Sequence, residues 1–385
     1  MKPLSDVTVV SVARLLPAEY LTLLLTHLGA RVIKIDNPKS PDYFRFTPPM
    51  KDDMSVYFKV FGANKESLAV NWGEPKGAEV VKRLVAKADI FIESFRPGVI
   101  EKAGFGYEAM KAANERLIYC SVTGYGANGP LSSKAGHDLN FNSYAGTLDP
   151  SLAEGGTPRM PAVLFGDMGG ALAATAAITA ALYGRERSGA GRKLDIALCD
   201  VAAHLISMAG AEFIATGKYR PEDYFLTGKY PRYRIYKAKA GFVAFAALEP
   251  KFWKTFCEVV GRTDLLDMEM EKLGDELVKL FASRTRDEWM TLFEEKDACI
   301  SPVLSVDEAV RSANFSARGV FRRASDGGND TEYVMGGIFG LSDENATDFY
   351  AAPREGEHSR AILLEFGFDE RDIEEMKREG VIKEI

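Results

Sequence analysis

The run Val-Thr-Val-Val-Ser-Val at residues 7–12, followed by the segments 17–28 and 31–35, decides the fold class. Residues 7–12 and Arg-Val-Ile-Lys-Ile at 31–35 are rich in β-branched side chains, so each predicts a strand. The leucine-rich segment between them predicts a helix. A strand, a helix and a second strand in this order form a unit whose two strands run parallel. We therefore expect an α/β protein with a doubly wound parallel sheet.

The same alternation continues towards the middle of the chain. Further strands are predicted at 67–70, 89–93, 117–123 and 193–198, and helices at 77–86 and 171–182. The segment 37–64, which is rich in proline and aromatic residues, predicts a long surface loop. The turn after the first strand reads Ala-Arg-Leu-Leu-Pro-Ala (13–18) and lacks GxGxxG, so the sequence does not support a nicotinamide or flavin dinucleotide site.

The pattern changes near residue 210, which predicts a second domain. A basic and aromatic segment at 229–239 precedes a predicted strand at 241–248 and a helix that starts at Glu249-Pro250. Helices at 275–282 and 286–295 and a strand at 299–303 follow. We expect a small α+β domain over 225–310, with 1–224 and 311–385 forming the large domain.

Composition excludes several classes of protein. The chain has 385 residues, of which 46% are apolar and 27% charged, and a net charge of −7, which argues against nucleic acid as the main partner. The most apolar run, 171–182, is shorter than the ~20 residues that a membrane span needs, and no apolar signal region opens the chain. The four cysteines are dispersed and form no CxxC pair, which predicts free thiols, no zinc site and a cytoplasmic location.

Two short motifs carry candidate catalytic residues. His137 lies in Ala-Gly-His-Asp-Leu-Asn (135–140), and Asp167 lies in Phe-Gly-Asp-Met-Gly-Gly (165–170), directly before the apolar helix. Small neighbours allow a ligand or another backbone to come close, and a helix N-terminus favours a negative charge. We expect His137 and Asp167 to face one substrate. The alternatives are a structural histidine and an aspartate that only caps the helix.

Two further candidates lie at the ends of predicted strands. Arg96, in Phe-Arg-Pro-Gly (95–98), follows the strand 89–93 and would lie at the carboxyl edge of the sheet, where ligands of open α/β sheets bind. Glu249 lies between a strand and Pro250, where it could serve catalysis or merely cap a helix.

Motifs along nearly the whole chain resemble those of family III CoA-transferases (the CaiB/BaiF type), a group that includes the α-methylacyl-CoA racemases. The corresponding segments are 28–36, 95–98, 117–119 with 124–126, 135–140, 166–167, 189–195 and 298–303. The resemblance implies a Rossmann-like large domain, a smaller domain and an interlocked homodimer. In that dimer the active site lies between the large domain of one subunit and the small domain of the other.

The resemblance leaves two chemistries open. In the racemases, the residues matching His137 and Asp167 exchange the proton next to an acyl-CoA thioester through an enolate, and the residue matching Glu249 orients the histidine from the partner subunit. In the transferases, the aspartate attacks a donor thioester and carries CoA as a covalent thioester. Proton exchange needs two groups on opposite faces of the enolate, whereas transfer needs one nucleophile. Because all three racemase positions are filled, we favour a 2-methylacyl-CoA racemase, with a CoA-transferase as the alternative.

The resemblance also predicts how the substrate is held. Arg96 is expected to bind a CoA phosphate, Gly136 and Asp138 belong to the CoA-contacting motif, and Lys65 corresponds to a basic family position. Backbone N–H groups at the start of the helix at Asp167 are expected to hold the enolate oxygen. CoA would enter as part of the substrate, and neither a metal nor another cofactor is required. A non-catalytic subunit is a further alternative, against which the intact Asp167 argues.

Overall fold

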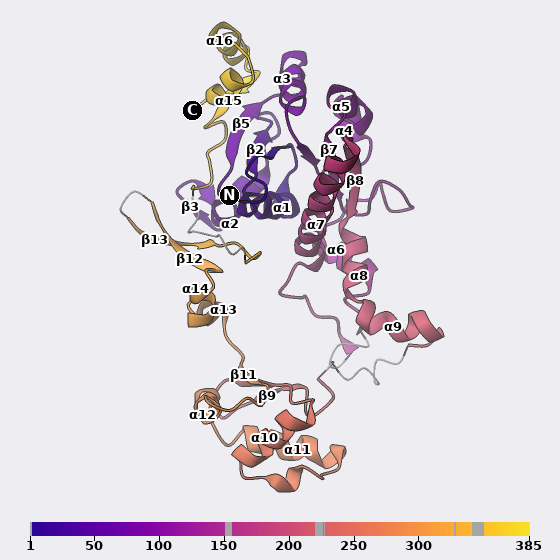
Figure 1. The fold of residues 1–385 in the computed structure, drawn as a ribbon, viewed down its shortest axis with the longest axis vertical. Coiled ribbons are helices and arrows are strands. Elements are labelled where there is room, and N and C mark those ends of the chain that lie inside the picture. The colour runs from indigo at the N-terminus through magenta and orange to yellow at the C-terminus, as the bar shows by residue number, and fades with distance from the viewer. Residues whose placement is uncertain (1, 151–155, 220–225, 227, 327–328, 341–349) are drawn as a thin grey trace. The chain divides into compact units, whose positions relative to one another are not determined.

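The computed structural model describes residues 2–150, 156–219, 226, 228–326, 329–340 and 350–385. The chain forms two compact units (Figure 1). The first contains 1–149, 158–207 and 318–385, and the second contains 150–157 and 208–317. The predicted small domain, 225–310, lies inside the second unit. The segments 208–224 and 311–317, which we assigned to the large domain, fall in the second unit as well.

A seven-stranded sheet forms the centre of the first unit. Its order is β14-β5-β2-β1-β6-β7-β8. The strands are β1 (Thr8–Ser11), β2 (Arg31–Asp36), β5 (Glu66–Val70), β6 (Ile90–Glu93), β7 (Ile118–Thr123), β8 (Arg192–Ala197) and β14 (Ile382–Lys383). All adjacent pairs are parallel except β14 and β5, which are antiparallel. The predicted parallel α/β fold is therefore confirmed, and the C-terminal segment adds an edge strand that the sequence did not reveal.

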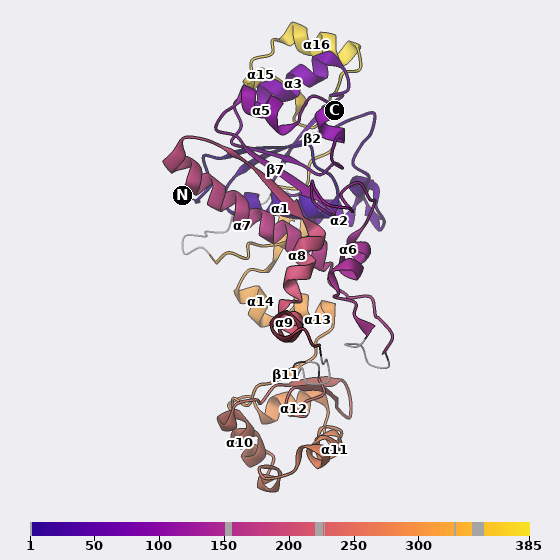
Figure 2. The same cartoon turned by 90° about the vertical axis from the view of Figure 1, so that its right-hand side faces the viewer.

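Helices cover both faces of this sheet (Figure 2). One face packs against α1 (Leu15–His27) and α7 (Phe165–Ser188), and the other against α3 (Pro75–Val85), α4 (Val99–Lys102), α5 (Tyr107–Ala113), α15 (Ser359–Glu365) and α16 (Glu370–Arg378). Alternate strand residues separate into the two cores, as the pleat requires: Val9 and Ile92 face α1 and α7, whereas Val10 and Phe91 face the other layer. Burial on both faces explains why the central strands β1, β6 and β7 read as apolar runs.

The helix α7 is longer than the apolar run that predicts it. It spans 24 residues, and by length and composition it could cross a membrane. Its residues Ala174, Ile178 and Ala181 are buried against α1 and the sheet, so these contacts account for its apolar character. It ends at Gly189, whose φ of 71° gives the left-handed cap typical of a helix C-terminus.

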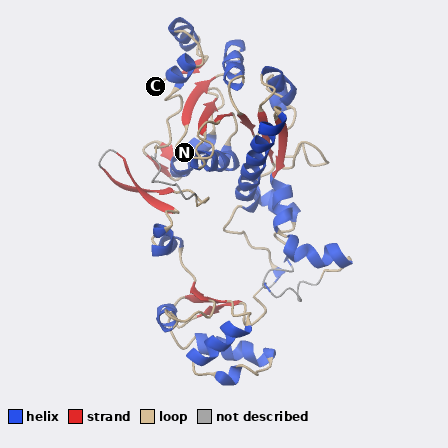
Figure 3. Cartoon of the chain, viewed as in Figure 1, coloured by secondary structure: helices blue, strands red, loops and turns tan. Residues whose placement is uncertain are grey.

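The second unit has its own aromatic core. Its sheet joins β9 (Arg234–Lys237), β10 (Phe242–Phe245) and β11 (Ile300–Pro302) in antiparallel order (Figure 3). Its helices are α9 (Ser207–Thr216), α10 (Pro250–Val259), α11 (Met270–Phe281), α12 (Arg286–Leu292), α13 (Val306–Val310) and α14 (Ala313–Ala317). Phe245, Phe256, Phe281 and Trp289 are at most 2% exposed and pack ring against ring.

The segment 37–64 is more ordered than a surface loop. It contains the 3-10 turn η1 (Tyr43–Phe46), the hairpin of β3 (Met50–Lys51) and β4 (Met54–Ser55), and the helix α2 (Val56–Phe61). Ser55 caps α2 with its hydroxyl, and Phe58 is fully buried. The expectation of a plain loop was wrong because Asp42 and Arg45, which look like surface residues in sequence, are 1% and 3% exposed.

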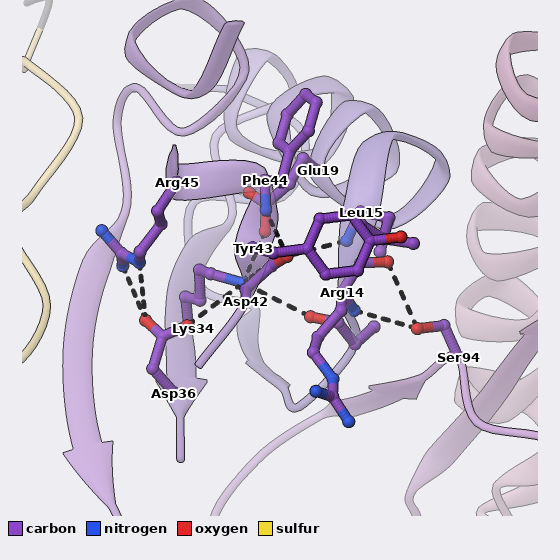
Figure 4. Close-up of polar contacts among 12 residues, drawn as sticks. Arg14, Leu15, Glu19, Lys34, Asp36, Asp42, Tyr43, Phe44, Arg45 and Ser94 are labelled. Atoms are coloured by element: carbon purple, nitrogen blue, oxygen red, sulfur yellow. Dashed lines mark hydrogen bonds and ion pairs between the residues drawn. The ribbon is translucent and has the colours of Figure 1, made fainter. Parts of the chain in front are cut away.

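These two residues belong to a buried network of six charged side chains (Figure 4). Lys34 Nζ lies 2.6 Å from Glu19, 3.0 Å from Asp42 and 3.6 Å from Asp36. The other cations complete the network: Lys65 pairs with Glu19, and Arg45 pairs with Asp36 at 2.6 Å. Each of the six is at most 4% exposed, and three positive charges balance three negative ones.

The network fastens α1, β2 and the segment 37–64 to one another. Burial alone raises the pKa of Glu19, but the charges of Lys34 and Lys65 lower it to about 2, so this carboxylate stays ionised in the folded protein. Asp42 also accepts a hydrogen bond from the backbone N–H of Leu15, whose φ of 70° is rare outside glycine. A left-handed leucine costs on the order of 1–2 kcal/mol, so the network holds a strained turn in place.

The substitution Lys34→Met should lower the free energy of unfolding by about 3–5 kcal/mol, because it leaves buried carboxylates without a counter-charge. Urea denaturation at neutral pH measures the loss. Lys59→Met is the matched control, since its partner Asp52 is 72% exposed and the loss of such a pair costs about 0–1 kcal/mol. Equal losses in the two variants would contradict a stabilising role for the network.

Candidate active site

A hollow of about 440 Å³ lies where the strand order of the sheet reverses. The strand β1 leads through α1 to β2 on one side, whereas its neighbour β6 leads through α4 and α5 to β7 on the other. Open α/β sheets bind ligands at the carboxyl ends of their strands at such a point. The lining includes Leu15 after β1, residues 94–97 after β6, residues 123–125 at the end of β7, and residues 134–137.

Hydrogen bonds join the loops that form one wall of the hollow (Figure 4). The Arg14 N–H donates to Ser94 Oγ at 2.9 Å, and the Ser94 hydroxyl donates to the Arg14 carbonyl at 3.3 Å. The Arg14 guanidinium lies 4.8 Å from the centre of the Phe95 ring and donates to Ser40 Oγ. The loops after β1 and β6 therefore hold each other, and Tyr43 from η1 lies beside them in the lining.

Two cationic side chains line the hollow without an ion-pair partner among the described residues. Arg96 lies where the sequence predicted, in the exposed turn after β6. Lys134 is a second exposed cation in the same lining, and sequence reasoning missed it although it directly precedes the Ala-Gly-His motif. Two unpaired cations at one sheet edge suit the phosphates of a nucleotide-bearing ligand.

His137 and Gly136 also line the hollow. His137 is exposed at the N-cap of α6 (Asp138–Ala145), and its N–H donates to Asn140 Oδ1 at 3.0 Å. A Cβ at Gly136 would lie 2.7 Å from the ring of Phe141 and 2.9 Å from the hydroxyl of Tyr125. A side chain at this position would therefore displace the packed rings of Phe141 and Tyr125.

Asp167 is the third residue of α7, as expected from the apolar run that follows it. Burial, and then the negative charge of Asp138, raise the pKa of the Asp167 carboxyl to about 7. The Asp167 N–H donates to Asp138 Oδ1 at 3.0 Å. This N–H is therefore occupied in the structure, and the expectation that N–H groups at the start of α7 hold an enolate oxygen stays a prediction.

The small residues around Asp167 serve helix packing. A Cβ at Gly170 would lie 2.2 Å from the side chain of Leu198, and one at Gly169 would lie 3.2 Å from Val201 and Leu205. These neighbours belong to α8 (Leu198–Leu205). Small residues allow either a ligand or another part of the chain to come close, and at these glycines it is the helix α8 that comes close.

Two predicted CoA contacts have side chains that are engaged inside the protein. Lys65 is 4% exposed, with its ammonium on the Glu19 carboxylate and carbonyl. Asp138 is 6% exposed, and its carboxylate accepts hydrogen bonds from Asp167 and from Asn142. Neither residue belongs to the lining of the hollow, and their assignment to CoA binding stays a prediction.

Glu249 belongs to the second unit, where it is the exposed N-cap residue of α10. Its side chain accepts no capping hydrogen bond, so a helix cap does not account for it. Among the described residues no group of three His, Cys, Asp or Glu side chains is arranged to hold a metal ion.

The fold and the hollow define an α/β protein with an exposed histidine and two unpaired cations at the carboxyl edge of its sheet. The family model described as CoA-transferase family III matches residues 4–359, and the chain belongs to this family. It is 30% identical to mouse succinyl-CoA:glutarate CoA-transferase, covering 100% of this chain and 91% of that protein. It is also 30% identical to human α-methylacyl-CoA racemase, covering 99% of this chain and 97% of that protein. A CaiB/BaiF family protein from Brucella suis has a similar structure, with a TM-score of 0.83 and 27% identity over 95% of this chain and 99% of that one.

Asp167→Asn should raise the melting temperature at pH 8 by a few degrees and leave it nearly unchanged at pH 4. The unfolded chain releases this proton near pH 4, whereas the folded protein keeps it to a pH of about 7. Because the folded state binds more protons in this window, stability falls as pH rises through it, and asparagine removes that loss. Thermal denaturation between pH 4 and 8 measures the effect. Asp200→Asn, at an exposed position, is the control. If its melting temperature rose at pH 8 as much as that of Asp167→Asn, the elevated pKa of Asp167 would be contradicted.

Proposed function

We propose that this family III enzyme is a 2-methylacyl-CoA racemase that exchanges the α-proton of its substrate through an enolate. The observation that carries the proposal is His137, which is exposed in the lining of the hollow that also contains Arg96 and Lys134. The Asp167 carboxyl, whose pKa is raised to about 7 by burial and by the charge of Asp138, supplies the second acid–base group. A group with this pKa is both protonated and ionised near neutral pH, which suits an acid–base catalyst. A nucleophilic carboxylate, in contrast, must be ionised.

In this mechanism, either His137 or Asp167 removes the α-proton from one face of the 2-methylacyl thioester. The C–H electron pair moves into the thioester to form the enolate, and the other residue returns a proton to the opposite face. The two enantiomers use the two residues in opposite order. Arg96 and Lys134 hold the CoA phosphates at the hollow, and no metal or further cofactor takes part.

Glu249 completes the proposed site from a second subunit. The family resemblance implies an interlocked homodimer in which the small domain of one chain meets the large domain of the other. The Glu249 carboxylate would then orient the imidazole of His137 and stabilise its charged form. The uncapped, exposed position of Glu249 is consistent with this role.

A CoA-transferase is the second candidate. Relatives named as CoA-transferases match the chain as well as the racemase does, at 30% identity for the mouse succinyl-CoA:glutarate enzyme. In this chemistry the ionised Asp167 attacks the carbonyl of the donor thioester, which forms an acyl–aspartyl anhydride and releases the CoA thiolate. The thiolate then attacks the aspartyl carbonyl, which gives the aspartyl-CoA thioester and releases the donor acid. The acceptor carboxylate takes up CoA from this thioester by the same two steps in reverse.

Proton exchange in deuterated water separates the two activities. The protein should incorporate deuterium at the α-carbon of a 2-methylacyl-CoA with no acceptor acid present, and His137→Ala should slow this exchange by at least about 100-fold, the usual contribution of a general acid or base. His204→Ala, in α8 and outside the lining of the hollow, is the matched control. Mass spectrometry or NMR of the recovered thioester measures the exchange.

The opposite outcome would establish the transferase. It consists of no exchange across a panel of 2-methylacyl thioesters, together with transfer of CoA to a free acid. Capture of the Asp167 thioester by hydroxylamine would identify the covalent intermediate.

Arg96→Ala should raise KM for an acyl-CoA about 10-fold with little change in kcat, because one charge-assisted phosphate contact contributes on the order of 1.4 kcal/mol. A substrate with the same acyl group on pantetheine lacks the nucleotide phosphates. Wild type and variant should therefore use it equally well. An equal loss on both substrates would show that Arg96 does not act on a phosphate.

A further inference from the structure

We propose that Asp138 is the positioning residue of this enzyme: its carboxylate fixes the backbone of Asp167 and couples it to the helix that presents His137. The inference rests on Asp167 being the reacting group of the proposed function, and it holds for both proton exchange and CoA transfer.

The first contact joins two helices. The first N–H groups of a helix have no partner within the helix. In α7 the backbone N–H of Asp167 is one of them, and it donates to Asp138 Oδ1 at 3.0 Å. A Cβ at Gly166 would lie 3.1 Å from the same oxygen and 3.4 Å from Phe141 Cβ. The glycine before Asp167 thus leaves the space in which the carboxylate lies, and a negative group at this end of α7 is also favoured by the helix dipole.

The second carboxylate oxygen is fixed from within α6. Asn142 is fully buried, and its amide nitrogen donates to Asp138 Oδ2 at 2.7 Å and to the Asp138 carbonyl at 2.8 Å. The Thr147 hydroxyl completes this chain of contacts, at 2.9 Å from the Asn142 amide oxygen and 3.0 Å from its carbonyl. With both oxygens occupied, the Asp138 side chain cannot turn without losing a hydrogen bond.

The location of Asp138 in the sequence gives this contact its significance. Asp138 is the first residue of α6, and His137 is the N-cap residue directly before it. The carboxylate that holds Asp167 is therefore attached to the residue next to the histidine. A displacement of about 1 Å between reacting groups can cost on the order of 100-fold in rate, so this link bears directly on catalysis.

Asp138 also acts on Asp167 through its charge. The elements packed against α7 carry the acidic, cysteine and histidine side chains Asp138 (α6), Cys199, Asp200 and His204 (α8), Glu19 and His27 (α1), and Cys120 and Asp195 (β7 and β8). Among these described groups, Asp138 is the one whose charge raises the pKa of the Asp167 carboxyl, in addition to burial. Position and proton affinity of the reacting group thus depend on one neighbour.

Two substitutions separate these effects. Asp138→Asn keeps an oxygen for the Asp167 N–H but removes the charge, so the limb of the pH–kcat profile that belongs to Asp167 should move to lower pH. Asp138→Ala removes the acceptor as well, and kcat should fall on the order of 100-fold with a much smaller change in KM. Asparagine should therefore restore most of the activity that alanine loses at the optimal pH.

Asn114→Ala is the control for loss of stability alone. Its amide donates to the carbonyls of Val85 and Ala88, away from α6 and α7. It should lower the melting temperature without moving the pH limb. The double variant Asp138→Asn/Asn142→Asp restores a donor–acceptor pair and one negative charge between the two positions. If Asp138→Asn folds poorly because two amide nitrogens face each other, the double variant should recover part of the folding and activity, since it restores the side-chain hydrogen bond but not the one from residue 142 to the carbonyl of residue 138.

The ionisation of Asp167 gives a readout that needs no turnover. A difference infrared titration of the carboxyl band, wild type against Asp167→Asn, reports its pKa, and the same pair in the Asp138→Asn background should titrate at lower pH. An unchanged titration, or a kcat for Asp138→Ala within about twofold of wild type, would overturn the inference. If wild type shows neither exchange nor transfer, the proposed function fails and the titration alone decides the role of Asp138.

Discussion

The buried pairing of Lys34 with Glu19, Asp36 and Asp42 is the constraint on which the N-terminal half of the first unit depends. Isolated charges could not remain in this interior, because removing each from water costs several kcal/mol. Each is tolerated because the others are present, and three cations face three anions. The network therefore forms only when α1, β2 and the segment 37–64 all occupy their native positions. Its charges disfavour arrangements that leave one of them unpaired, and they do this more than they add to the net free energy of folding.

The same network shapes the candidate active site. Asp42 holds the N–H of Leu15 at the start of α1, and both Leu15 and the neighbouring Tyr43 line the hollow. The carboxyl ends of β1 and β6 are then joined through Arg14 and Ser94. A charged cluster outside the lining of the hollow thus determines where the first wall of the candidate site lies.

Local pattern was sufficient to predict the parallel strands, the helix after Asp167 and the turn that presents Arg96. These predictions depend on hydrophobic periodicity, on runs of β-branched residues and on apolar runs, all of which are visible in residues that are close together in the sequence. The burial of Lys65, the ordered segment 37–64 and the edge strand β14 depend on partners far away in sequence. Lys65 pairs with Glu19, and β14 pairs with β5. A single charged residue carries no local signal that its counter-charge lies 46 positions away.

The active-site motif shows the same limit on a smaller scale. Two short motifs identified His137 and Asp167 as candidate catalytic residues, and the family resemblance assigned Asp138 to CoA binding. The structure uses it to hold the first turn of α7. A carboxylate with this task raises the proton affinity of the carboxyl it positions. The position of the Asp167 backbone and the proton affinity of its carboxyl therefore depend on the same carboxylate, which sequence spacing alone could not reveal.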